Sequence, residues 1–342
     1  MSNPPLDRDV LRRALGLELD ETSTEALFGR GADVARYEGK VRDNYTTRDG
    51  RRYLVTTDRI SAFDRVLGTL PLKGQILNAL ATHWFRESAH VAPNHLISMP
   101  DPNVVEAMEC KPLPVEMVVR SYLTGITSTS VWTHYAQGER TFCGHALPDG
   151  LKKNDPLPRP ILTPSTKAAK GGHDVSASRE EILVEGRITA ADFDLAGEMS
   201  LAMFAFGQKR CAERGLVLVD TKYELGRTKD GRIVFIDEIH TPDSSRFWFA
   251  ATLAERAARG EEPESFDKEY VRRWLSDRGF AGDGPIPAIP DDIRVEASRR
   301  YAEAYETIVG APLAVDLAPP LTRMFDNLRR AEAGARSAGA EN

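Results

Sequence analysis

The sequence has few cysteines, no long hydrophobic run and no block of like charges. Its three cysteines, Cys110, Cys143 and Cys211, are odd in number and fit no metal-ligand spacing, which indicates free thiols in a reducing cytoplasm. We expect no signal peptide and no membrane span, because no apolar stretch approaches the roughly 18 residues that a span requires. Basic and acidic residues are interspersed and the net charge is −6, so binding to nucleic acid is not expected. No obligate protein partner is evident.

Apolar residues make up 41% of the 342 residues, which is enough for a substantial core and about two lobes. We expect residues 1–113 to form an N-terminal cap of short helices and a small antiparallel lobe. The stiff segment 112–115 marks the boundary, and residues 114–330 form a larger lobe that ends in helices. The glycine and proline content of residues 143–164 favours an extended excursion over regular structure, and residues 331–342 are expected to form a frayed tail.

Residues 216–248 combine two short apolar runs with a concentration of charge. The runs 216–219 and 233–236 flank Asp230-Gly231, a dipeptide typical of a two-residue type I′ turn. With that turn, the segment forms a hairpin in which Glu224 lies directly opposite Asp237.

The same register places Lys222 opposite Ile239 and puts Asp220, Lys222 and Glu224 on one face of their strand, because side chains alternate with a period of two. Facing carboxylates repel, so a sequence that keeps both commonly supplies a cation between them. Mg²⁺ is the candidate, since this hard ion accepts one or two carboxylates and completes its octahedron with water and substrate phosphates. Alternatively, Glu224 and Asp237 both lie on a solvated face.

A glycine and two basic residues lie between two of the expected N-terminal strands. Gly39 allows the backbone to approach a ligand closely, and Lys40 and Arg42 add two positive charges. Such a loop can hold a triphosphate, although its spacing is neither that of a P-loop nor that of a dinucleotide fold, and a plain surface turn is the alternative. Asp64 lies in a loop near a helix entry, where it is either a turn former or a ligand to a polar substrate.

Two further positions are candidates for anion binding. Arg120 ends an apolar strand and precedes the hydroxyl-rich segment 124–130, which together offer a guanidinium fork with hydroxyl and backbone donors. The alternative is an arginine that simply extends to solvent. Lys167 ends the run Thr-Pro-Ser-Thr-Lys in a loop, where it either closes on a phosphate or carboxylate or remains solvated.

Six segments carry these features in a fixed order: YEGKVRD (37–43), TDRISAFD (57–64), PVEMVVR (114–120), LTPSTKA (162–168), VDTKYELG (219–226) and DEIHTPDSSR (237–246). Together they resemble the SAICAR synthetase family, the phosphoribosylaminoimidazole-succinocarboxamide synthases, in its longer form. The resemblance implies a two-lobed α+β fold. A small antiparallel nucleotide-binding lobe, similar to the small lobe of protein kinases, accompanies a larger α+β substrate and metal lobe.

The resemblance also implies an activity. The enzymes of this family are ATP-dependent ligases that join L-aspartate to the carboxylate of carboxyaminoimidazole ribotide (CAIR), giving SAICAR, ADP and phosphate in purine biosynthesis. ATP and Mg²⁺ are the implied cofactors, CAIR and L-aspartate are the small-molecule substrates, and an acyl phosphate is the expected intermediate because a carboxylate is a poor acyl donor.

Position by position, the resemblance implies roles for individual residues. The ATP phosphates would be bound by Gly39, Lys40, Val41, Arg42 and Lys167. Mg²⁺ would be bound by Glu224 and Asp237. The ribotide would contact Arg120, Ser130, Lys222 and Arg246, in a site also lined by Asp64, Asp220, Asp243 and Ser244. The residues expected to carry the chemistry are Lys40, Lys167, Asp220, Glu224 and Asp237, with Asp220 a candidate base for the aspartate amine.

Two departures from the family pattern are visible. Gly125 is followed by Ile126 where family members usually have serine, which indicates an insertion of residues 126–129 and leaves Ser130, or failing that Ser128, in the role of that serine. Leu225 replaces a more usual aromatic or isoleucine and affects packing only. A kinase-like phosphotransferase is the main rival, but the chain lacks H-R-D and D-F-G motifs, while a non-catalytic nucleotide-binding protein would not need both candidate metal ligands.

Overall fold

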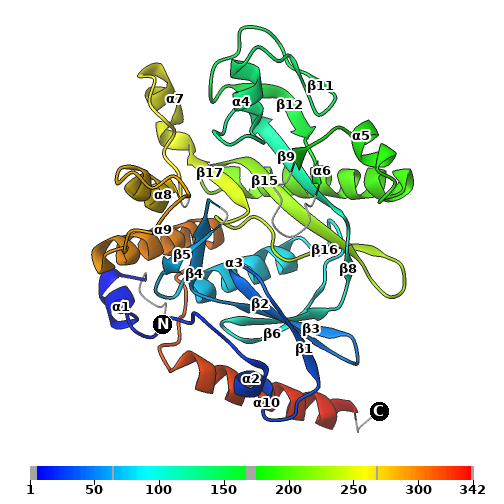
Figure 1. The fold of residues 1–342 in the computed structure, drawn as a ribbon, viewed down its shortest axis with the longest axis vertical. Helices are drawn as coiled ribbons and strands as arrows, with labels where there is room; N and C mark the ends of the chain where they lie inside the picture. The colour runs from blue at the N-terminus through cyan, green and yellow to red at the C-terminus, as the bar shows by residue number, and fades with distance from the viewer. Residues whose placement is uncertain (1–5, 64, 167–174, 267–268, 340–342) are drawn as a thin grey trace. The chain divides into compact units, whose positions relative to one another are not determined.

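The computed structural model describes residues 6–63, 65–166, 175–266 and 269–339 (Figure 1). The chain divides into two compact units. Unit 1 comprises Met1–Phe85, His95–Glu109 and Phe266–Asn342, and unit 2 comprises Arg86–Asn94 and Cys110–Ser265. The chain first enters unit 2 at Arg86, returns to unit 1 at His95 and enters unit 2 again at Cys110, just before the expected boundary segment 112–115. The C-terminal helices group with unit 1, whereas we had placed them with residues 114–330.

Unit 1 contains the expected small antiparallel sheet, with strand order β1-β2-β3-β7-β6. Its strands are β1 (Val34–Glu38), β2 (Arg42–Thr47), β3 (Arg51–Thr56), β6 (Leu96–Asp101) and β7 (Val104–Met108). One face of the sheet buries Tyr45, Tyr53 and Val55 against Leu27 and Met324. The residues of this core come from both ends of the chain, so the terminal helices are part of the unit rather than appendages.

The other elements of unit 1 are α1 (Arg8–Arg13), α2 (Thr24–Phe28), β4 (Arg59–Ala62), β5 (Arg65–Thr69), α3 (Lys73–Glu87, whose last two residues fall in unit 2), α8 (Glu269–Ser276), α9 (Asp291–Val309) and α10 (Pro320–Gly339). Helices α2 and α10 belong to the core on the sheet, and the others form a second core. The cap of short helices expected within residues 6–28 is confirmed by α1 and α2. The frayed tail expected from residue 331 is not observed, because α10 continues to Gly339.

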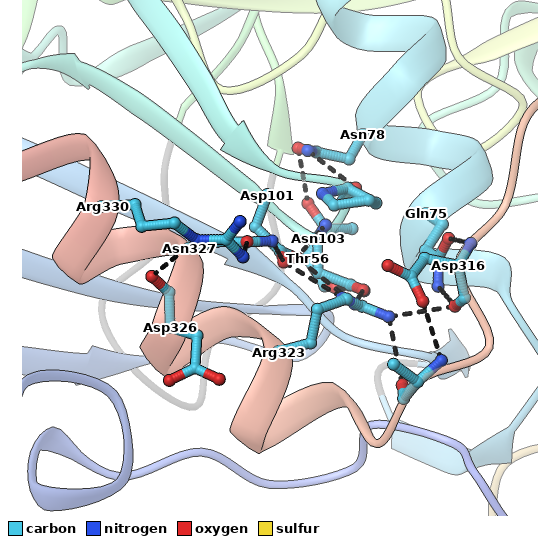
Figure 2. A network of polar contacts seen from close by, with 12 residues as sticks. Thr56, Gln75, Asn78, Asp101, Asn103, Asp316, Arg323, Asp326, Asn327 and Arg330 are labelled. Atoms are coloured by element: carbon cyan, nitrogen blue, oxygen red, sulfur yellow. Dashed lines mark hydrogen bonds and ion pairs between the residues drawn. The ribbon is translucent and has the colours of Figure 1, made fainter. Parts of the chain in front are cut away.

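Helix α10 is held on the sheet by a buried polar network (Figure 2). Arg323 donates to the Asp101 carboxylate from Nε at 3.0 Å and to the Asn103 side-chain oxygen, and Asn327 donates to Asp101 at 2.6 Å. Asn103 in turn donates to the backbone oxygen of Thr56 at 2.8 Å. A buried arginine is stable only when its donors are paired in this way, so the network fixes where the C-terminal helix docks.

Unit 2 is organised around the long strand β15. Its sheet has the order β14-β13-β9-β15-β16, with β12 also pairing with β9, and β17 and β8 with β15. The strands are β8 (Lys111–Pro112), β9 (Val115–Tyr122), β12 (Pro156–Leu162), β13 (Ser165–Thr166), β14 (Val175–Ser176), β15 (Leu216–Arg227), β16 (Ile233–Ile236) and β17 (Ser245–Phe249). Helix α6 (Ala190–Ala212) packs against β15 and β9 (Figure 1). The other elements are α4 (Val131–Ala136), β10 (Thr141–Phe142), β11 (His145–Ala146), α5 (Arg179–Val184) and α7 (Ala250–Ala258).

The excursion expected for residues 143–164 is more regular than predicted. Strand β12 pairs antiparallel with β9 even though prolines occupy positions 156, 158 and 160. Its register is interrupted between Pro156 and Ile161, and β9 is its only partner among the described strands. Prolines lack the N–H group that a ladder needs, so they are tolerated in an edge strand whose register is broken.

The predicted hairpin forms, but its register differs from the prediction by one residue. Glu224 lies opposite Ile236, not opposite Asp237. The reason is the turn: the backbone N–H of Thr228 donates to the carbonyl of Arg232 at 2.9 Å, which leaves a three-residue loop ending at Gly231 with φ 90°. A left-handed glycine at the last loop position is a common three-residue hairpin, and it accommodates Asp-Gly as readily as a type I′ turn does.

The structure also bears on two simpler expectations. No helix within the described ranges is long and apolar enough to span a membrane. Cys110, Cys143 and Cys211 are free thiols, as predicted.

Candidate functional site

A charged face lies on the two central strands of unit 2. Asp220 of β15 pairs with Arg120 of β9, and Lys222 lies opposite Val118, so the alternating side chains of both strands emerge on the same side. The predicted grouping of Asp220, Lys222 and Glu224 on one face agrees with the ion pairs that Lys222 forms with Glu224 and that Asp220 forms with Arg120. Arg120 lies on the same face, because it is two residues from Val118.

Asp220 is the partner of two arginines. Its Oδ2 accepts a hydrogen bond from Nη1 of Arg246 at 2.7 Å and lies 3.5 Å from Nη1 of Arg120. Arg246 reaches it from β17, where the two residues are paired across the ladder. Burial lowers the pKa of Arg120, an effect that Asp220 opposes and Arg246 reinforces. The carboxylate thus holds two guanidinium groups together that would otherwise repel.

Lys222 bridges two carboxylates. Its Nζ lies 2.8 Å from Oε1 of Glu116 and 2.7 Å from Oε1 of Glu224. Burial disfavours the charged form, yet the carboxylates of Glu224, Glu116 and Asp237 raise the pKa of Lys222 well above its usual value. Asp237 is therefore close enough to act on the same ammonium group, although the hairpin ladder does not pair it with Glu224.

Asp237 owes its position to the backbone just beyond β16. The strand ends at Ile236, and Asp237 follows with φ 64°, a left-handed conformation that only a few residue types adopt readily. A second such residue, His240, has φ 49°. The chain thus turns twice between β16 and β17. Asp237 therefore does not follow the regular alternation of side chains that the predicted hairpin register assumed.

The turning segment, residues 237–246, is tied to β15. The backbone N–H of Lys222 donates to the carbonyl of Ser244 at 2.9 Å, and the Tyr223 hydroxyl lies 2.5 Å from Nε2 of His240. The backbone N–H of Asp243 donates to the Thr241 hydroxyl at 3.2 Å. Asp243 and Ser244 therefore belong to the segment beside Lys222.

The donor set fits Mg²⁺. Within the described ranges, no group of three or more histidine, cysteine or acidic residues is arranged to hold a metal ion. Glu224 and Asp237 offer two hard oxygen ligands near one cation, and a magnesium ion typically takes one or two carboxylates and fills its other positions with water and phosphate oxygens. A site with two protein carboxylates suits Mg²⁺ better than a metal that needs a closed protein cage.

The expected anion loop after Arg120 is largely engaged with itself. Arg120 donates from Nε to the Thr163 hydroxyl at 2.9 Å and from Nη2 to the Thr129 carbonyl at 3.1 Å. The Ser130 Oγ accepts from the backbone N–H of Thr127 at 3.0 Å and lies 2.8 Å from the Thr127 hydroxyl. Residues 126–129, the inferred insertion, thus supply contacts to both Arg120 and Ser130, and Ser130 is buried at the start of α4.

In unit 1, residues 39–42 form a tight connection between β1 and β2. The backbone N–H of Gly39 donates to the carbonyl of Arg42 at 2.8 Å. A Cβ on Gly39 would lie 2.8 Å from that carbonyl oxygen, so the turn requires glycine. Lys40 is exposed at its tip, while Val41 and Arg42 are partly buried. Two other predicted residues, Asp64 and Lys167, lie outside the described residues.

Sequence reasoning missed three charged residues in the quoted motifs. Glu116, the partner of Lys222, shares a strand face with Arg120 because the two are four residues apart, and that spacing was the available signal. Asp43 and Arg59 form a buried ion pair at 2.7 Å beside residues 39–42.

The comparisons with known proteins agree on one family. The family model described as SAICAR synthetase matches residues 35–286. A phosphoribosylaminoimidazole-succinocarboxamide synthase of Legionella pneumophila is 46% identical over 312 residues, covering 90% of this chain and 97% of the relative. A SAICAR synthase structure from Saccharomyces cerevisiae, complexed with SAICAR, is 29% identical, with a TM-score of 0.73 and coverage of 87% of this chain and 100% of that one. A type-2 SAICAR synthetase in complex with ADP is 25% identical, with a TM-score of 0.62 and coverage of 82% and 100%.

Fold and relatives together define an ATP-dependent carbon–nitrogen ligase of the α+β class. The chain belongs to the SAICAR synthetase family. It joins L-aspartate to CAIR at the expense of ATP, giving SAICAR in purine biosynthesis.

Proposed function

We propose that the charged face of β9 and β15, together with residues 237–246, binds the ribotide and Mg²⁺, and that residues 39–42 bind the ATP phosphates. The observation that carries the first part is the Lys222 bridge, 2.8 Å from Glu116 and 2.7 Å from Glu224. In the absence of a metal ion, the Lys222 ammonium offsets the repulsion between the carboxylates of Glu116 and Glu224. A bound divalent ion would take over part of that neutralisation at Glu224.

The residues divide into three groups. The ATP phosphates are bound by Gly39, Lys40, Val41 and Arg42, with Lys167 closing on them. Mg²⁺ is held by Glu224 and Asp237, and when bound it neutralises charge on the phosphates and polarises the substrate carboxylate. The ribotide is bound by Arg120, Ser130, Lys222 and Arg246, in a site lined by Asp64, Asp243 and Ser244. Asp220, whose Oδ2 accepts from Arg246, orients both arginines toward the substrate's anionic groups.

The chemistry we propose proceeds through an acyl phosphate. A CAIR carboxylate oxygen attacks the γ-phosphorus of ATP and ADP leaves, so that the carboxyl carbon gains a phosphate leaving group. The aspartate amine then attacks that carbon, the C–N bond forms, phosphate departs, and the amine loses its proton. Lys40 and Lys167 stabilise charge on the transferring phosphoryl group, which is the main task of the protein in such transfers.

An isotope experiment tests this route. CAIR labelled with ¹⁸O in its carboxylate is turned over with ATP, Mg²⁺ and aspartate, and the released phosphate is examined by mass spectrometry. One labelled oxygen in phosphate supports the acyl phosphate, whereas unlabelled phosphate contradicts it. The Glu224→Gln variant tests the metal role separately: we expect it to fold normally, to lose calorimetric Mn²⁺ binding and to lose turnover, and normal Mn²⁺ affinity would contradict the assignment.

We also propose that the enzyme works in the reducing cytoplasm with small-molecule substrates and no obligate protein partner. Burial raises the pKa of the Cys143 and Cys211 thiols to about 12. Such thiols are protonated at neutral pH and unreactive, as suits cysteines that have no redox role.

A further inference from the structure

Arg59, at the start of β4, directs two of its three guanidinium nitrogens, Nε and Nη2, at the segment that precedes β2. Its side chain is 5% exposed. Nε donates to the carbonyl of Lys40 at 3.0 Å, and Nη2 donates to the carbonyl of Gly39 at 3.0 Å. Nη1 donates to the carbonyl of Asp20. One buried side chain therefore ties down two consecutive peptide groups of residues 39–42.

Asp43 fixes the position of that guanidinium. Its Oδ1 accepts from Nη2 of Arg59 at 2.7 Å, and its side chain is fully buried. The other oxygen, Oδ2, accepts from the Thr22 hydroxyl at 2.5 Å. A carboxylate held from two sides has little freedom, so it orients the arginine as well as neutralising it.

The direction of the carbonyls determines the direction of the N–H groups. In a trans peptide the C=O and N–H bonds point opposite ways. The carbonyls of Gly39 and Lys40 point inward at Arg59, so the N–H groups of the next residues, Lys40 and Val41, point away from it. Successive N–H groups aimed to one side form a concavity suited to an anion.

We propose that Arg59, held by Asp43, is a positioning residue for nucleotide binding: it fixes the peptide groups of residues 39–41 so that the N–H groups of Lys40 and Val41 face the ATP phosphates. The inference rests on the proposed function, in which this segment binds ATP. The ion pair links the segments that contain Asp43 and Arg59, and the proposal gives a role to both residues.

The test uses Arg59→Lys, which keeps the positive charge but cannot donate to two carbonyls and a carboxylate at once. We expect the KM for ATP to rise about 10- to 100-fold, the range that small misplacements produce. The KM values for CAIR and aspartate should change less than about twofold. Calorimetric affinity for ADP should fall by the same factor as the KM for ATP rises.

The matched control is Arg323→Lys. Arg323 and Asp101 form an ion pair in the same unit with the same side-chain exposures as Arg59 and Asp43, 5% and 0%, but Arg323 does not contact residues 39–42. We expect it to lower Tm with little effect on ADP affinity. If Arg59→Lys behaves like this control, Arg59 has only a structural role and the inference is wrong.

Two further variants cover the remaining outcomes. If Arg59→Lys does not fold, Asp43→Asn, which keeps one oxygen acceptor for the guanidinium, should shift ADP affinity in the same direction by a smaller factor, and an unchanged affinity would overturn the proposal. Lys40→Ala separates the inference from its premise. Unchanged ADP affinity in Lys40→Ala refutes the placement of ATP, whereas weakened affinity there with normal affinity in Arg59→Lys refutes only the role of Arg59.

Discussion

Lys222 donates from Nζ to Glu116 at 2.8 Å, which pins a residue of β15 to a carboxylate of the neighbouring strand β9. The same ammonium group contacts Glu224 at 2.7 Å. Glu116 therefore neutralises part of the positive charge of Lys222. The part that Glu116 does not neutralise repels a metal ion at Glu224, so Glu116 affects how readily Glu224 binds a metal ion.

The Glu116→Gln variant should weaken Mg²⁺ binding. With a neutral residue at position 116, the Lys222 ammonium is balanced by one carboxylate fewer and repels a divalent ion more strongly. We expect the calorimetric affinity for Mg²⁺ to fall about tenfold, the order that one unit charge at short range produces near a protein surface. The Mg²⁺ concentration for half-maximal activity should rise in parallel.

Glu109→Gln is the control for Glu116→Gln, because Glu109 is likewise paired with a basic residue, Arg52, but belongs to unit 1. Its Mg²⁺ affinity should match that of the unmodified enzyme. Unchanged or tighter Mg²⁺ binding in Glu116→Gln would show that Glu116 does not share the charge of Lys222 in the way proposed.

Local patterns predicted the charged face but not its partners. The period of two placed Asp220, Lys222 and Glu224 together, and the contacts of Asp220 and Lys222 agree with that placement. The register was wrong by one because Asp230-Gly231 suits either a two-residue or a three-residue loop, and backbone conformation alone decides between them. The position of Asp237 near Lys222 depends on its own left-handed backbone conformation, which no sequence pattern predicts.

Long-range pairings lay beyond the reach of sequence reasoning. Glu116 and Lys222 are 106 positions apart, and Arg323 and Asp101 are 222 positions apart. The second pair explains why α10 belongs to unit 1, since this helix docks through a buried arginine whose carboxylate partner is Asp101. Periodicity identifies which face of a helix is apolar, but it does not identify the surface that the face covers.

Gly39→Ala should disrupt the connection between β1 and β2. The new Cβ would lie 2.8 Å from the carbonyl oxygen of Arg42, and a backbone atom cannot move aside as a side-chain end can. We expect unfolding free energy to fall by about 1–3 kcal/mol and the KM for ATP to rise. Gly334→Ala in α10, with no atom within 4 Å of its Cβ, should instead gain up to about 1 kcal/mol through helix propensity. Chemical denaturation measures both, and equal effects would contradict the steric argument.

Asp58 should give the enzyme a pH-dependent stability between about pH 4 and pH 6. Its carboxylate is buried and accepts from the backbone N–H groups of Leu19 and Gly74, each at 2.7 Å. Burial raises the pKa of Asp58 to about 6 from 3.8, although both hydrogen bonds oppose the shift. The folded state therefore binds the proton more tightly than the unfolded state, so the contribution of Asp58 to stability is greatest below about pH 4 and is lost as pH rises through 6.

The Asp58→Asn variant isolates this effect. It should lower stability by about 1–3 kcal/mol, because the amide NH₂ would face a backbone N–H that then lacks an acceptor. The difference in unfolding free energy between the two proteins should shrink as pH rises from 4 to 7. Urea denaturation at several pH values provides the comparison, and a difference that is constant with pH would mean that Asp58 does not titrate in this range.

Gly207→Ala should disturb the proposed substrate segment from the opposite side of the sheet. A Cβ on Gly207 of α6 would lie 2.3 Å from Cε1 of His240, whose ring is hydrogen-bonded to Tyr223. The imidazole must shift, and residues 237–246 shift with it, so we expect a loss of about 1–3 kcal/mol in stability and a lower kcat. Gly197→Ala on the same helix is the control, because its Cβ meets only the end of the Leu162 side chain at 3.0 Å. Both variants gain the same helix propensity of about 1 kcal/mol, so the difference between them isolates the clash with His240. Equal kcat values in the two variants would show that the position of His240 does not affect the activity of residues 237–246.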